Sequence, residues 1–208
     1  MKMWIKVSQN QSELIASLFD EARHLIEQGN HECAVKMLQK CLNLGPEPKM
    51  RASILNESGY CCLRLGWFEE AAISLSEYLK IDPLDNDGRF FLASAYASMK
   101  WTDEAMEELK TILRTDPTDV LARHDLALCF RNKGWLKESL EEMTKANEYA
   151  ATYGNAEEKE IVKSSLGHIE EEIQDGDEDG TKETFLLLIL LATIMKRLKL
   201  KTGKPPRR

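Results

Sequence analysis

Apolar residues recur at intervals of three and four from Leu14 to Ala150, which is the period of an amphipathic α-helix. No stretch alternates between apolar and polar residues, so the pattern predicts helices and no strands. Turn signals interrupt the pattern regularly, and proline ends a helix because it lacks an N–H donor and disfavours helix in the preceding residue. One set of turns falls at Gly29-Asn30, Gly66-Trp67, Lys100-Trp101 and Gly134-Trp135, and the other at Gly45-Pro46, Asp82-Pro83 and Asp116-Pro117. The alternation of the two sets predicts successive helical hairpins.

The predicted hairpins are copies of one unit. Trp67, Trp101 and Trp135 stand 34 residues apart, and Ala71 and Ala105 repeat at the same spacing. A fixed period of this size indicates one supersecondary unit that is copied and stacked. Stacked helical hairpins form a curved surface that binds other molecules.

The copies resemble tetratricopeptide repeats, and the resemblance covers about two-thirds of the chain. The repeats run over residues 15–48, 52–85, 86–119 and 120–153. The family has a small residue at position eight, alanine at twenty and proline at thirty-two. The matching residues are Ala22, Gly59, Ala93 and Ala127, then Ala34, Ala71, Ala105 and Ser139, then Pro46, Pro83 and Pro117. The fourth position is usually large and apolar; Leu18 and Leu55 comply, whereas Arg89 and Arg123 do not.

The expected fold is therefore all-α, a right-handed solenoid of about four hairpins over residues 1–153. Residues 154–174 keep a helical apolar pattern, which predicts a helix that caps the solenoid. An acidic linker is expected over residues 175–183. A hydrophobic helix with a basic tail is expected over residues 184–208.

The resemblance implies that the first helix of each hairpin lines a concave groove. The residues then expected to bind a partner are Phe19, Arg23, Asn56, Tyr60, Arg64, Phe90, Ser94, His124, Leu128 and Arg131. Aromatic side chains with a few cations suit a peptide or helix that has apolar anchors. One subclass of the family grips acidic chaperone C-termini with lysine, asparagine and arginine. Its pattern is absent here, because Phe19, Arg23, Asp87 and Phe91 occupy the decisive positions.

A second, narrower resemblance concerns the segment 87–93. Its sequence DGRFFLA is similar to the middle repeat of bacterial type III secretion chaperones for translocator proteins. Those chaperones hold an extended segment of their client in the groove. The resemblance implies a secretion chaperone as an alternative function, although the long C-terminal extension is not typical of that class.

Charge and cysteine content narrow the choice of ligand. The net charge of the chain is −7, but residues 184–208 carry seven Lys or Arg and no acid, which leaves −14 on the remainder. An acidic body disfavours nucleic acid, whose phosphates need cations. The five cysteines include no Cys-x-x-Cys pair, so we expect free thiols, no zinc and no cofactor. A cytoplasmic protein is the resulting expectation.

The sequence contains two acidic patterns, a candidate calcium-binding loop and three pairs of adjacent glutamates. Asp175, Asp177 and Asp179 match the opening of a calcium-binding loop, but Leu186 stands where a bidentate glutamate belongs. A solvated linker is favoured over this weak calcium candidate.

The pairs Glu69-Glu70, Glu107-Glu108 and Glu141-Glu142 are expected near helix N-termini, where carboxylates are stabilising. No catalytic motif accompanies them, so we expect no enzyme.

The segment from Phe185 to Met195 is almost wholly apolar. As a helix its 11 residues would reach about 16 Å, against about 30 Å for the hydrocarbon core of a membrane. Leu188 and Leu191 belong to the apolar surface, which surrounds the helix and must be buried. Three alternatives follow: packing on the protein, pairing in a homodimer through residues 184–200, or contact with a membrane surface.

The function expected from the sequence is a non-catalytic scaffold that binds a peptide or helix of a partner protein in the groove. The second alternative, besides the secretion chaperone, is an adaptor that the C-terminal segment tethers to a membrane.

Overall fold

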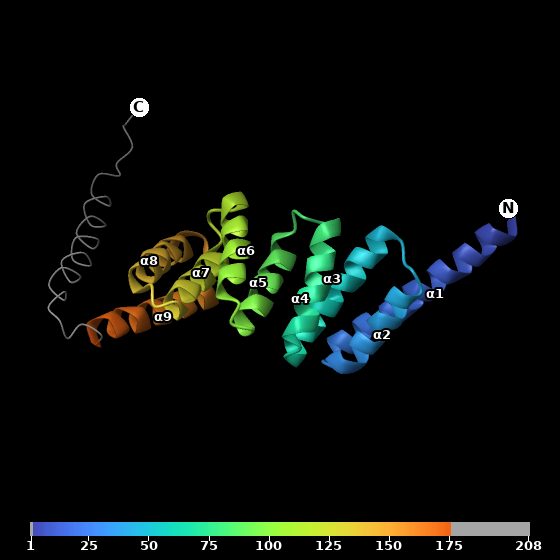
Figure 1. Ribbon diagram of the computed structural model, residues 1–208, viewed down its shortest axis with the longest axis horizontal. Coiled ribbons are helices and arrows are strands. Elements are labelled where there is room, and N and C mark those ends of the chain that lie inside the picture. The colour runs from blue at the N-terminus through green and yellow to red at the C-terminus, as the bar shows by residue number, and fades with distance from the viewer. Residues whose placement is uncertain (1, 176–208) are drawn as a thin grey trace, which may run out of the picture.

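The computed structural model describes residues 2–175 of the chain, and in that range the structure is helical with no strand (Figure 1). Among the helices of the described residues, α1 is the longest and α9 is the last. The bounds are α1 (Lys2–Glu27), α2 (His31–Asn43), α3 (Pro48–Leu65), α4 (Phe68–Ile81), α5 (Asn86–Ser98), α6 (Thr102–Thr115), α7 (Val120–Asn132), α8 (Leu136–Tyr153) and α9 (Ala156–Asp175).

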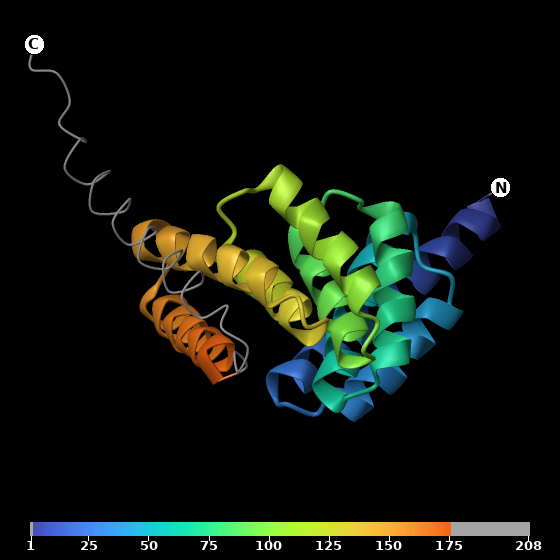
Figure 2. The same ribbon diagram turned by 60° about the vertical axis from the view of Figure 1, so that its left-hand side comes forward.

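The helices form a right-handed solenoid. Each helix packs mainly on the helix before it and the helix after it, so α1/α2, α3/α4, α5/α6 and α7/α8 are hairpins stacked in chain order. Figures 1 and 2 show this stack running from α1 at one end to α8 and α9 at the other. The odd-numbered helices also contact one another, α1 with α3, α3 with α5 and α7 with α9. They therefore make up one layer, which is the inner layer in the expected fold.

The turn inside each hairpin depends on a residue in the left-handed conformation. Gly29, Gly66 and Gly134 have φ values of 76°, 76° and 75°, and Lys100 has φ 62° at the equivalent place. Only glycine adopts this region without steric cost, and it is the usual residue just past a helix C-terminus. The next residue then donates its N–H back to the helix, as Trp101 does to the Tyr96 carbonyl at 2.9 Å.

Lys100 is accordingly a strained copy of a glycine position. We expect Lys100→Gly to raise the free energy of unfolding by about 0.5–1 kcal/mol, because it removes the Cβ clash. Urea denaturation at equilibrium measures this change. Lys133→Gly is the control, because Lys133 closes α7 with φ −86° and gains nothing from glycine. A loss of stability in Lys100→Gly would contradict the assignment of strain.

Small residues allow the helices of a hairpin to approach closely. Ala22, Ala93 and Ala127 are buried in the core. Gly59 of α3 faces Leu75 of α4, and a Cβ at Gly59 would lie 2.5 Å from Leu75 Cγ. The family position eight is thus small because a larger side chain would push the two helices apart.

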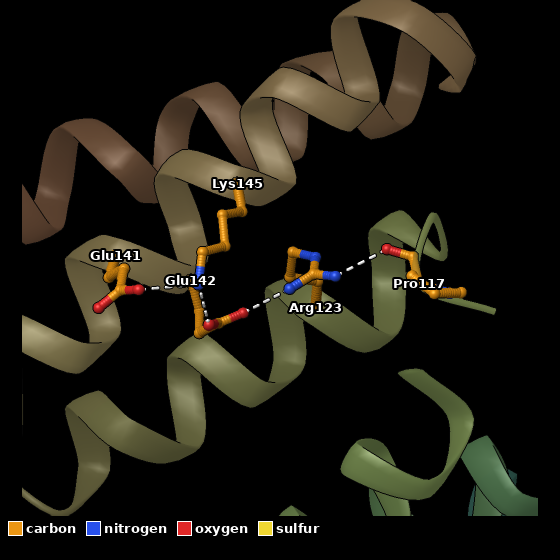
Figure 3. Close-up of polar contacts among 5 residues, drawn as sticks. All are labelled: Pro117, Arg123, Glu141, Glu142 and Lys145. Carbon is orange, nitrogen blue, oxygen red and sulfur yellow. Dashed lines mark hydrogen bonds and ion pairs between the residues drawn. The ribbon is translucent and has the colours of Figure 1, made fainter. Parts of the chain in front are cut away.

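The two arginines that depart from the repeat pattern make equivalent contacts inside their hairpins. Arg123 donates to Glu142 Oε2 at 2.6 Å and to the Pro117 carbonyl at 2.7 Å (Figure 3). Arg89 donates to Glu108 Oε2 at 2.5 Å and to the Pro83 carbonyl at 2.8 Å. Each arginine joins the start of its hairpin to the second helix and to the preceding turn.

This finding corrects the interpretation of the paired glutamates. Glu69 and Glu70 do lie in the first turn of α4. Glu108 and Glu142, however, lie beyond the first turns of α6 and α8, because those helices begin at Thr102 and Leu136. Their role is to pair with the arginines, and the helix dipole does not account for them.

Candidate functional site

The expected groove residues divide into three groups by exposure. Phe19, Asn56, Tyr60, Phe90 and Ser94 are half-buried. Arg23 and Arg64 are exposed. The remaining three, on α7, lie beneath or beside α9 and are described separately below.

The aromatic members are held by the helices around them. The Tyr60 ring on α3 lies 5.8 Å from the Phe91 ring of α5 and 6.0 Å from the His31 ring of α2, measured between centroids. Phe90 packs against the core shared by α5, α6 and α7. These side chains therefore combine a packing role with a partly accessible surface, and they are fixed before any partner arrives.

Arg23 and Arg64 differ from most other arginines of the described chain. Arg51, Arg89, Arg123 and Arg131 each pair with a glutamate. Within residues 10–175, Arg23 and Arg64 make no ion pair and no side-chain hydrogen bond. An exposed guanidinium without an internal partner is available for a carboxylate, which it binds through paired hydrogen bonds.

Helix α9 covers the last of the expected groove residues. His124 is 7 % exposed, and its Nε2 lies 3.0 Å from Ser165 Oγ of α9. Arg131 donates from Nε to Glu172 Oε2 at 2.5 Å. Leu128 packs into the core shared with α9. The structure thus places these three residues in the contact between α7 and α9, and the face that remains open belongs to α1, α3 and α5.

The contacts also give the direction of α9. His124 meets Ser165 and Arg131 meets Glu172, so both helices run the same way, as successive first helices do in a solenoid. Val162, Ile169 and Ile173 are the buried residues of α9. The last helix therefore packs as the first helix of a fifth hairpin would, which is the geometry of a solenoid cap.

The contacts of His124 have the order of a catalytic triad. Its Nδ1 lies 2.8 Å from Asp125 Oδ1, and its Nε2 faces Ser165. A triad also needs free N–H donors beside the serine for the oxyanion. Ser165 lies inside α9, where the backbone N–H groups are used within the helix. The arrangement fixes α9 onto α7 and lacks the donors that acyl transfer requires.

The sequence also raised the questions of a metal site and of a membrane-contacting segment. Within residues 2–175, no group of three or more His, Cys, Asp or Glu side chains could hold a metal ion. No helix in the same range is long and apolar enough to cross a membrane. Asp175 ends α9, whereas Asp177 and Asp179 of the calcium candidate lie outside the described residues. Phe185, Leu188, Leu191 and Met195 of the apolar segment also lie outside them.

The cysteines occupy the core as small apolar residues. Cys41, Cys61, Cys62 and Cys129 are buried, and Cys33 is exposed. Burial raises the pKa of Cys61 to about 12 and the pKa values of Cys62 and Cys129 to about 11. The thiolate is the reactive form, so these thiols are inert near neutral pH.

We therefore expect one fast-reacting thiol in the folded protein. Addition of a colorimetric disulfide reagent at pH 8 should modify Cys33 quickly, and the other four only after unfolding in guanidinium. Cys33→Ser removes the fast phase and serves as the control. Two or more fast thiols in the native protein would contradict the burial of Cys61, Cys62 and Cys129.

One surface feature escaped the sequence reasoning. Trp67, Trp101 and Trp135 marked the repeat, but they are also 38 %, 51 % and 45 % exposed. A surface cleft of about 410 Å³ beside Trp101 is lined by Lys100, Thr102, Asp103, Glu104 and Lys133. The signal that could have found it is the position of each tryptophan at a hairpin turn, because turns lie at the surface.

Stacked helical hairpins whose first helices form one layer define a class of solenoid that binds other macromolecules. Comparison with known proteins identifies the repeat. Residues 52–83 and 87–119 match the family model described as tetratricopeptide repeat. The chain thus contains tetratricopeptide repeats, and residues 2–175 fold as a tetratricopeptide-repeat solenoid. No curated protein sequence matches the chain significantly.

Solved structures share this fold at low sequence identity. MamA residues 41 to the end, from Desulfovibrio magneticus RS-1, has 18 % identity and a TM-score of 0.66, with 88 % of this chain and 96 % of that chain covered. YrrB, described as a tetratricopeptide-repeat protein with an unusual peptide-binding site, has 18 % identity and a TM-score of 0.56, with coverages of 73 % and 84 %. The Sgt2 repeat domain from Aspergillus fumigatus has 19 % identity and a TM-score of 0.55, with coverages of 64 % and 85 %.

Proposed function

We propose that this protein is a non-catalytic scaffold that binds a peptide or helical segment of a partner protein on the open face of α1, α3 and α5. The observation that carries the proposal is the pair Arg23 and Arg64. Both lie at inner-face positions of the repeat, and both lack a partner within the described residues although the protein is acidic. Such unpaired cations suit the carboxylates of a ligand.

The aromatic residues supply the apolar part of the proposed site. Tyr60 and Phe90 are half-buried and held in place by their neighbours, so binding would cost little side-chain entropy. Rigid aromatics and arginine are the residue types that carry most interface energy. A ligand with apolar side chains and one or two carboxylates matches both features. YrrB, whose fold is similar, is described as peptide-binding, which is consistent with this reading.

The other functions expected from the sequence gain less support. The family-model match and the curated proteins give no support to the resemblance to type III secretion chaperones. The membrane-tethered adaptor depends on the segment 184–208, of which the described residues give no test. His124, Leu128 and Arg131 are not part of the proposed site, because α9 covers them.

Charge reversal tests the proposed site with little risk to the fold. A 12-residue random peptide library should enrich peptides that combine apolar and acidic residues. Arg23→Glu and Arg64→Glu should each weaken the best peptide about tenfold or more, since a charged hydrogen bond contributes about 1.5–3 kcal/mol. Isothermal titration calorimetry measures the dissociation constants.

Arg114→Glu is the matched control. Arg114 lies on α6, is exposed, and has only Thr111 as a hydrogen-bond partner. Its reversal should leave the affinity unchanged. Equal weakening by all three variants would show a general charge effect, and no weakening by Arg23→Glu and Arg64→Glu would rule out the open face as the binding site. Alanine at Tyr60 or Phe90 is a poorer test, because both rings also contact buried neighbours.

A further inference from the structure

The edge of the solenoid formed by the hairpin turns carries a row of tryptophans. Trp67, Trp101 and Trp135 are the residues that precede α4, α6 and α8. We call this row, with the first turns of the three helices, the turn edge. The three side chains are 38–51 % exposed although each belongs to the largest apolar residue type. Exposed aromatic side chains that recur along one edge are a candidate contact surface.

Two of the indoles are held in place by their own hairpins. The Trp101 ring stacks on Tyr96 with centroids 5.8 Å apart and an interplanar angle of 22°. The Trp135 ring lies 6.0 Å from Phe130 at 32°. One part of each ring is thus packed while the rest stays open. A fixed flat apolar surface binds apolar side chains at a low cost in conformational entropy.

Carboxylates accompany the tryptophans along the turn edge. The first turns of the three helices contribute Glu69, Glu70, Asp103, Glu104 and Glu138. The nearby cations are Lys100, Lys133 and Lys137, with Arg64 and Arg131 in the last turns of α3 and α7. The end of α9 adds three further carboxylates beside Arg131, those of Glu171, Glu172 and Asp175. Lys133 pairs with Asp103 and lies 4.8 Å from the centre of the Trp135 ring. The turn edge is therefore apolar with an excess of negative charge.

The described chain also ends at this edge. Arg131, which pairs with Glu172, stands four residues before Trp135. A cleft of about 520 Å³ is lined by Arg131, His168, Glu171, Glu172 and Asp175. Because Asp175 is the last residue of α9, the chain continues from beside the turn between α7 and α8.

The length of the linker fits a return to the turn edge. Residues 176–184 would span up to about 30 Å when extended. Packed helices lie about 8–10 Å apart, so this reach extends past Trp135 to Trp101. As a helix, residues 185–201 would be about 25 Å long, which exceeds the width of one hairpin.

We propose that residues 185–201 of the same chain bind along the turn edge, with the apolar segment on Trp101 and Trp135 and the cations beside the acidic first turns. Phe185 to Met195 supplies apolar surface that must be buried. Lys196, Arg197, Lys199 and Lys201 supply the complementary charge. The open inner face suits this segment less, because its unpaired Arg23 and Arg64 would repel those cations.

The proposal separates two binding surfaces on one solenoid. The C-terminal segment occupies the outer turn edge, and the inner face of α1, α3 and α5 stays open. Removal of the segment from the edge would thus expose the tryptophans without changing the inner face. The turn edge and the inner face can therefore be tested separately.

Photo-crosslinking in the full chain tests the placement directly. A benzoylphenylalanine at position 188, in place of Leu188, should crosslink within one chain to the tryptic peptides 101–110 or 134–137, which carry Trp101 and Trp135. Crosslinks confined to the tryptic peptide 52–64, which carries Tyr60 of the inner face, would overturn the proposal. Crosslinks between two copies, or a chain without crosslinks at peptides 101–110 and 134–137, would also overturn it.

Fluorescence gives a second test that does not need a crosslinker. In a Trp4→Phe background, Leu188→Asp with Leu191→Asp should raise acrylamide quenching of the remaining tryptophans about twofold, because the edge loses its cover. The control is Leu84→Asp, which adds a charge at a side chain already 82 % exposed and should leave quenching unchanged. Unchanged quenching in the double variant would overturn the proposal. Circular dichroism confirms that the variants remain folded.

Discussion

Glu142→Ala is expected to lower the free energy of unfolding by about 3 kcal/mol, because it leaves the largely buried Arg123 guanidinium without its carboxylate. The side chains of Arg123 and Glu142 are only 11 % and 16 % exposed. Guanidinium denaturation followed by circular dichroism measures the loss. Glu141→Ala is the matched control: Glu141 is exposed and pairs only with Lys145, so its removal should cost about 0.5 kcal/mol.

The chain itself suggests the variant that should restore stability. The positions of Arg123 and Glu142 are occupied by Leu18 and Met37 in the first repeat. Both belong to the apolar cluster around α1 and α2. Arg123→Leu with Glu142→Met should therefore recover most of the stability that Glu142→Ala loses, because an apolar pair replaces a buried ion pair at little cost. A loss of about 3 kcal/mol in the double variant as well would show that the hairpin depends on the charges themselves.

Ile169→Ala in α9 is the second change with a large expected effect. Ile169 is fully buried in the core that α9 shares with α7 and α8. Replacing a buried isoleucine by alanine costs about 2–5 kcal/mol, so we expect about 3 kcal/mol here. The repeats at the end of a solenoid can unfold while the rest stays folded. The loss of stability should therefore appear first as faster hydrogen exchange in α7, α8 and α9.

Ile161 is the control for this change. It lies on the same helix but is 39 % exposed, so Ile161→Ala should cost less than about 1 kcal/mol. Similar losses in both variants would contradict the orientation of α9. Unchanged exchange in α7 after Ile169→Ala would contradict its role as the cap of the last hairpin.

The fold was predictable because its determinants are local and repeated. The 34-residue spacing of Trp67, Trp101 and Trp135, and the glycines before two of them, specify a hairpin that recurs. The apolar positions Val162, Leu166, Ile169 and Ile173 likewise specified the buried side of α9, whereas Ile161 of the same pattern is 39 % exposed. Each of these signals lies within one or two turns of the element that it defines.

The candidate site was less predictable because it depends on contacts between distant segments. Nothing near His124 in the sequence shows that Ser165 of α9 covers it. The charge pattern gave the glutamates a plausible role at helix N-termini, but the pairing of Arg89 with Glu108 is set by the packing of two helices. The sequence also does not show which arginines lack an ion-pair partner. Arg23 and Arg64 stand out only in the structure, where four other arginines pair with glutamates.

Hydrogen exchange with a bound peptide is the most direct test of the scaffold function. The peptide should be the best binder from the random library, added in excess to the full chain. The account predicts slower exchange in residues 12–27, 53–64 and 86–98, which carry the open inner face, and little change in α4, α6 and α8. Protection confined to the even-numbered helices or to the turn edge would contradict it.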